Sequence, residues 1–207
     1  MAWVLDTNIF VISIYDSLYL EAFKKFVSSE NEPIPSFLLD EIHNKNCELH
    51  FLLQKILNSM KRGVLIKKID ELKELRKFYS NIFDFLGRRS RGFGDNIVLM
   101  DTMEKCLDRI HDIDSWADKI KCYPSSEHDE RAILEKYRDI LQKLERIDGL
   151  HMADLRIIVI LNHMYKGCVE NVTFVTRDGG LYRNKKVLEE NFPNIKICKI
   201  KRYINSG

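Results

Sequence analysis

The stretch Trp3–Phe10, WVLDTNIF, decides the fold, because a short apolar run ends abruptly at an aspartate. Val4 and Leu5 favour a buried strand, and Asp6 with the two polar residues after it is typical of the start of a helix. Two interpretations of Asp6 follow. It is a helix cap, or it lies at the carboxyl edge of a parallel sheet, where α/β proteins place their chemistry.

The C-terminal part of the chain repeats this pattern. FVTRD, ending at Asp178, is again an apolar strand followed closely by an aspartate. Helical patterns over residues 149–167 and 181–192 and a final strand over 195–200 give an alternation of strands and helices, which predicts parallel pairing with helical crossovers. We therefore expect strands 3–5 and 172–176 to be adjacent and parallel, with Asp6 and Asp178 on one edge.

The remaining elements are expected to be mostly helical. A helix capped by Ser36 precedes a second helix over residues 48–61, which Gly63 ends; VLIKKI, residues 64–69, is a strand candidate. Residues 85–147 show helical periodicity and no strand pattern. We predict one α/β domain over residues 1–207 with an all-helical insertion at 85–147.

Composition favours a globular protein, with 45% hydrophobic and 31% charged residues. Residues 166–207 carry nine basic and four acidic side chains, so a polyanion is expected to meet this part first.

The five cysteines lack a CxxC pair, which argues against a zinc site or a disulfide framework. With no leader and no apolar run near the roughly 18 residues of a membrane span, we expect a cytoplasmic protein without a membrane partner.

Two further acids stand in patterns that suggest a shared site. Asp154 interrupts an apolar helix, where an unpaired carboxylate is expensive to bury, and Glu41 lies on the helix after the second extended segment. Gathered carboxylates repel one another unless a divalent cation neutralises them. Each acid also has a plain structural interpretation: a helix cap for Asp6 or Asp178, an exposed helix acid for Glu41, and an ion pair with Arg156 or Lys166, or exposure to solvent, for Asp154.

Four motifs, taken in order, resemble those of the PIN-domain nucleases: VLDTN at Asp6, PSFLLDEI at Glu41, HMADLRIIVIL at Asp154 and FVTRD at Asp178. The resemblance covers residues 1–83 and 148–207. It implies a VapC-like core with a PIN-like central parallel sheet flanked by helices. Glu41 falls at the family's position rather than the adjacent Asp40, and we take Asp154 rather than Asp148 because it lies within the apolar helix.

The resemblance implies metal-dependent hydrolysis of phosphodiester bonds in RNA. Mg²⁺ or Mn²⁺ offsets the charge of the phosphodiester and lowers the pKa of a bound water. Asp6 and Asp178 are then the principal metal ligands, Asp154 is a direct or second-sphere ligand, and Glu41 orients the attacking water. Asn8 and Thr176 are expected to support this site, Thr176 by a hydrogen bond to a ligand carboxylate.

Contacts to RNA phosphates are expected from two groups of basic residues. The first follows a helix in the glycine-containing stretch RRSRGFG, and the second surrounds the last aspartate. Charged, solvated surface is the alternative for both. The candidates are Arg88, Arg89, Arg91, Arg177, Arg183, Lys185 and Lys186.

Three classes of function are open. The favoured one is an active endoribonuclease, either an RNA-processing enzyme with a ribosomal or RNA-processing partner, or a toxin held by an antitoxin. A PIN-like scaffold that binds RNA or protein is the second, although all four acids are present. The third class is an unrelated α/β domain, either a receiver or a nucleotide-binding domain. The paired acids of a receiver and the phosphate-binding glycine loop of a nucleotide-binding domain are not evident in the sequence. RNA is the expected partner, and a homodimer is left open.

Overall fold

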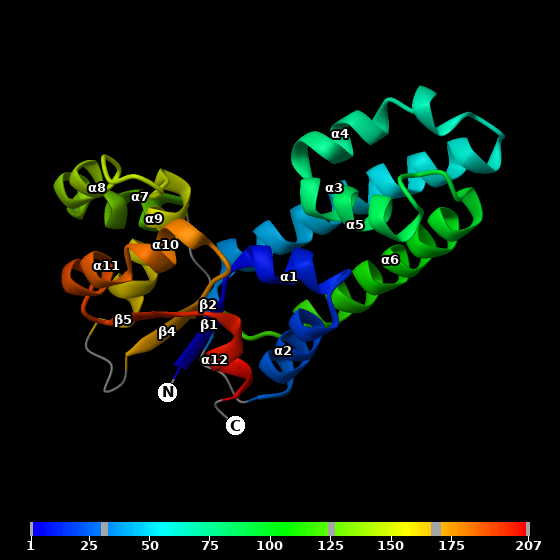
Figure 1. The fold of residues 1–207 in the computed structure, drawn as a ribbon. Coiled ribbons are helices and arrows are strands. Elements are labelled where there is room, and N and C mark those ends of the chain that lie inside the picture. Colours follow the sequence, from blue (N-terminus) through cyan, green and yellow to red (C-terminus); the bar gives the residue numbers. More distant parts are fainter. Residues whose placement is uncertain (1, 30–32, 124–126, 167–170, 206–207) are drawn as a thin grey trace. The chain divides into compact units, whose positions relative to one another are not determined.

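A computed structural model describes residues 2–29, 33–123, 127–166 and 171–205 (Figure 1). The chain forms two compact units, each built from separate stretches of sequence. The sheet unit comprises Met1–Ile9, Glu21–Leu39 and Ile120–Gly207. The helical unit comprises Phe10–Leu20 and Asp40–Lys119.

The centre of the sheet unit is a three-stranded parallel sheet. Its strands are β1 (Ala2–Leu5), β4 (Val172–Val175) and β5 (Ile195–Cys198), in the order β1-β4-β5. The predicted pairing of the first strand with the strand at 172–176 is confirmed. Register places Trp3, Thr173 and Lys196 in one cross-strand row, and Leu5, Val175 and Cys198 in the row two residues on. Residues of one row point to the same face of the sheet.

The strands are mostly apolar because helices flank the sheet. Every residue of β4 is buried, as is typical of parallel strands covered on both faces. The helices of this unit are α2 (Ser17–Ser28, which begins in the other unit), α7 (Glu127–Lys136), α8 (Arg138–Leu144), α9 (Met152–Met164), α10 (Gly179–Arg183), α11 (Lys185–Asn191) and α12 (Ile200–Ile204). Helix α9 buries four consecutive aliphatic residues, from Ile158 to Leu161, and also Leu155, which explains its almost wholly apolar sequence.

A second, two-stranded sheet corrects the prediction of an all-helical insertion over residues 85–147. Strand β3 (Cys122–Tyr123) lies in this region and pairs in parallel with β2 (Ile34–Pro35). The strand is two exposed residues long, so it shows no alternation of buried and exposed side chains that periodicity detects. The boundaries also differ: residues 85–119 belong to the helical unit, and 120–147 to the sheet unit.

The helical unit is built around two long helices, α3 (Ser36–Lys61, which begins in the sheet unit) and α6 (Asn96–Ala117), with α4 (Glu71–Phe78) and α5 (Ser80–Arg89) between them in sequence. Helix α1 (Thr7–Ser13) crosses from the sheet unit into this one. The two helices expected over residues 36–61 are a single helix, since Asn46 and Leu49 are buried on its continuous inner face. It ends before Gly63, whose φ of 79° suits a glycine.

The strand expected at residues 64–69 is a 3₁₀ turn, η1 (Ile66–Lys68). Its backbone groups are satisfied locally, because Lys68 N donates to Leu65 O and Ile69 N to Ile66 O. Leu65 is exposed, so this apolar run packs into no sheet. Apolar composition alone therefore misidentified the element.

Among the residues described, none of the helices combines the length and apolar character needed to cross a membrane. Cys47, Cys106, Cys122 and Cys198 are unbridged, and Cys168 lies outside the described residues.

Candidate functional site at the carboxyl edge of the sheet

Asp6 lies directly after β1, at the carboxyl edge of the sheet, and is 2% exposed. Its backbone N–H donates to Val175 O at 2.9 Å, which extends the ladder by one residue. Its Oδ1 accepts from Asn8 N at 3.1 Å, so the carboxylate also caps α1. Asp6 is therefore both a helix cap and a residue at the carboxyl edge of the sheet, and its role in chemistry stays a prediction.

Thr176 connects Asp6 to Asp178. Its hydroxyl, in a side chain only 1% exposed, donates to Asp6 Oδ2 at 2.6 Å and accepts from the backbone N–H of Asp178 at 2.9 Å. The backbone N–H of Thr176 donates to Cys198 O, which fixes it to β5. The expected hydrogen bond from Thr176 to a candidate ligand carboxylate is thus present, and it fixes the orientation of that carboxylate.

Asp178 is half-buried and precedes the short helix α10. Its Oδ1 accepts from Leu181 N at 2.7 Å, a capping bond like that of Asp6. The two aspartates therefore end neighbouring parallel strands, and each leaves its carboxylate at a helix start. The hydrogen bond from Thr176 to Asp6 in this connection spans 170 positions of sequence.

Asp154 lies in the first turn of α9 and is half-buried. The sequence predicted a carboxylate buried within an apolar helix, but the buried part of α9 begins after it, at Leu155. A carboxylate in a first helical turn is favoured by the helix dipole. Its position is therefore less costly than the sequence suggested.

A close contact between two glycines fastens the start of α9 to α10. Gly149 has a φ of 80°, and a Cβ atom built on Gly180 would overlap the Gly149 carbonyl oxygen. Asn184 Nδ2 donates to Asp148 O at 3.1 Å and to Gly180 O at 3.0 Å. The segment that leads to Asp154 is thereby joined to the turn that carries Asp178. The sequence motifs gave no signal for Asn184; the paired glycines Gly179-Gly180 were the only trace of this contact.

Glu41 lies in the helical unit, on α3. Its Oε1 pairs with Lys45 Nζ at 2.6 Å, one turn along the helix, and its side chain is 35% exposed. The plain alternative was an exposed helix acid, but Glu41 is half-buried and ion-paired instead. Its participation in a site with Asp6 stays a prediction.

The predicted phosphate-binding residues lie in both units. Six of the seven side chains are exposed, and Lys185 is half-buried with its Nζ 5.0 Å from the centre of the Tyr182 ring. Arg91 lies in a turn with a φ of 51°, fastened by buried Ser90, whose Oγ donates to Leu86 O and accepts from Phe93 N. The RNA contacts themselves stay predictions.

The donor set at the sheet edge consists of carboxylate oxygens. Within the described part of the chain, no three His, Cys, Asp or Glu side chains form a ready-made metal cage. Mg²⁺ is commonly held by only one or two carboxylates, with waters and substrate phosphates completing its shell. Asp6 and Asp178 therefore suit Mg²⁺ or Mn²⁺ in type and number. No family model, curated protein or solved structure matches this chain.

Proposed function

We propose that this protein is a metal-dependent endoribonuclease whose site is the carboxyl edge of the sheet, with a PIN-like core. The observation that carries the proposal is the Asp6–Thr176–Asp178 connection. One buried hydroxyl joins the carboxylate of Asp6 to the backbone N–H of Asp178, and these two aspartates follow adjacent parallel strands. The order and flanking sequences of the four acidic motifs support the same conclusion.

A purely structural role for this connection is the main competing explanation. Both aspartates cap helices, and a cap requires only an acceptor of the amide hydrogen, which asparagine supplies nearly as well. Asp6 is 2% exposed, and burying a charged side chain is costlier than burying a neutral cap. The presence of aspartate rather than asparagine at both positions favours a cationic ligand over capping alone.

Each residue of the site has a distinct role in this proposal. Asp6 and Asp178 hold Mg²⁺ or Mn²⁺, and Asp154 contributes from the start of α9, directly or through a water. Thr176 fixes one oxygen of Asp6. The bound cation supplies an activated water and neutralises charge on the phosphate. Basic residues near Asp178, Arg177 and Arg183 among them, bind flanking phosphates of the RNA.

Asp6→Asn tests the proposal, and Asp16→Asn is its matched control. Asp16 Oδ1 also accepts a backbone amide two residues on, from Leu18 N at 3.0 Å. Both substitutions retain a capping acceptor, but only the first removes the charge next to Thr176. We expect Asp6→Asn to reduce Mn²⁺-dependent RNA cleavage by more than the roughly 10–100-fold typical of losing a supporting residue. Asp16→Asn should cleave at the wild-type rate.

Metal binding is measured separately by the shift in melting temperature on adding Mn²⁺. A ligand stabilises the native state according to its affinity, so the shift should be large in the wild type and small in Asp6→Asn. Chelation should abolish cleavage. If Asp6→Asn cleaves RNA as fast as the wild type, or a chelator leaves cleavage unchanged, the proposed activity is wrong and Asp6 is only a cap.

A further inference from the structure

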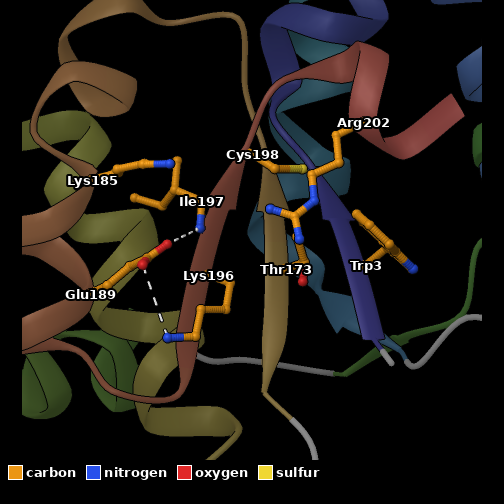
Figure 2. Close-up of a pocket in the computed structure, with 8 residues that line it drawn as sticks. All are labelled: Trp3, Thr173, Lys185, Glu189, Lys196, Ile197, Cys198 and Arg202. Carbon is orange, nitrogen blue, oxygen red and sulfur yellow. Dashed lines mark hydrogen bonds and ion pairs between the residues drawn. The ribbon is translucent and has the colours of Figure 1, made fainter. Parts of the chain in front are cut away.

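A pocket of about 280 Å³ lies on one face of the central sheet (Figure 2), and none of Asp6, Asp154 and Asp178 is among the residues that line it. Its floor comes from the row formed by Trp3, Thr173 and Lys196, together with Cys198 of the next row. Helices α11 and α12 contribute charged side chains around it. The pocket lies wholly within the sheet unit.

The hydroxyl of Thr173 is the unusual group in this pocket. Thr173 is 4% exposed, and no described residue hydrogen-bonds to its Oγ1. A buried hydroxyl without a partner destabilises a fold, and valine would fill the same volume without that penalty. Figure 2 shows this hydroxyl at the floor of the pocket, with the Arg202 side chain reaching toward it.

The charged groups around the pocket leave a positive surplus. Glu189 Oε1 accepts from Ile197 N at 2.8 Å, and its Oε2 lies 3.9 Å from Lys196 Nζ. Lys185 and Arg202 then have no carboxylate opposite them among the residues that line the pocket. Burial raises the pKa of the Cys198 thiol to about 11, although Arg202 and Lys185 act to lower it. The thiol is therefore neutral near pH 7 and does not offset the two cations.

We propose that this pocket binds a phosphate monoester attached to a planar group, of which a nucleotide is the example. The phosphate carries a charge between about −1.5 and −2 near pH 7, which matches the cations Lys185 and Arg202. The half-buried indole of Trp3 offers a surface on which a base stacks. Thr173 donates its hydroxyl hydrogen to the ligand. This site is independent of the proposed metal chemistry.

The test uses the full chain with EDTA present, so that failure of the metal site does not affect it. In a Trp116→Phe background, Trp3 is the only tryptophan and its fluorescence reports binding. The probes are AMP, adenosine, inorganic phosphate and a 5′-phosphorylated oligonucleotide. We expect AMP to bind more tightly than adenosine or phosphate. Tighter binding of the oligonucleotide than of AMP assigns the site to an RNA end, and the reverse assigns it to a free nucleotide.

Arg202→Gln and Lys201→Gln are a matched pair. Both residues are exposed on α12, but only Arg202 lines the pocket. Loss of a charge-assisted contact to phosphate should weaken AMP binding about tenfold in Arg202→Gln, whereas Lys201→Gln should stay within about twofold of the wild type. Absence of AMP binding up to about 1 mM, or equal weakening by both substitutions, overturns the proposal.

Thr173→Val separates a ligand-binding hydroxyl from a structural one. We expect the melting temperature of the unliganded protein to stay the same or rise, since an unsatisfied buried group is removed. The AMP-induced rise in melting temperature should shrink. A fall in unliganded stability with unchanged AMP binding would show that Thr173 serves the fold and not the pocket.

Discussion

At the scale of single residues, the hydroxyl of Thr176 connects the residues that follow two neighbouring strands. It both donates to Asp6 and accepts from the Asp178 amide, so Thr176→Val leaves the Asp178 amide hydrogen without its acceptor. We expect a loss of about 1–3 kcal/mol in the free energy of unfolding, measured by urea denaturation in EDTA. Mn²⁺ affinity, measured by calorimetry, should fall about 10–100-fold. Thr176→Ser retains the hydroxyl and should restore both; wild-type Mn²⁺ affinity in Thr176→Val would refute a supporting role.

His163, in the last turn of α9, makes stability depend on pH. Burial lowers its pKa below 6.5, and the nearby charges of Lys136 and Lys166 lower it further. The unfolded chain therefore binds the proton more readily, so stability is retained above about pH 6.5 and declines as pH falls through the interval below it. His163→Gln should therefore reduce the difference in urea midpoint between about pH 7.5 and 5.5. An unchanged difference in His163→Gln would contradict this.

At the scale of elements, the contact of α10 with the segment before α9 depends on Gly180. Gly180→Ala places a methyl group against the Gly149 carbonyl, and we expect a loss of about 1–3 kcal/mol from overpacking. Gly179→Ala is the control, because nothing lies within 4 Å of its added Cβ, and it should stay within about 1 kcal/mol of the wild type. Urea denaturation measures both. Equal stability of the two variants would show that the segment around Gly149 moves to accommodate the methyl group at little cost.

These elements also show what the sequence reveals and what it leaves open. Strands β1 and β4 were predictable because each is a short apolar run with an aspartate close behind, and parallel pairing then placed Asp6 and Asp178 on one edge. Gly180 was not recognised, because its partner Gly149 is distant in sequence and no local pattern encodes the contact. Helical periodicity identified most helices. It shows that one face of a helix is buried, but it does not show in which of the two hydrophobic cores that face is buried. The two-unit division was missed for that reason.

At the scale of the whole molecule, each unit has its own hydrophobic core. Leu53 in the helical unit and Leu188 in the sheet unit are both fully buried, so Leu53→Ala and Leu188→Ala are chemically identical changes in different cores. Each should reduce stability by about 2–5 kcal/mol. Amide hydrogen exchange should accelerate chiefly in the unit that carries the substitution. An equal acceleration across both units in both variants would show a single cooperative structure instead.

The pairing of β1 with β4 also governs the order in which a nascent chain acquires structure. The ribosome releases β1 and must then add every segment of the helical unit before β4 emerges. At about 5–20 residues per second, that delay lasts on the order of ten seconds or more. Throughout it, the apolar edge of β1 has no parallel neighbour, even after the last segment of the helical unit has been added. Translation that stalls before β4 therefore yields chains with an unpaired strand edge, the kind of surface that recruits chaperones or aggregates.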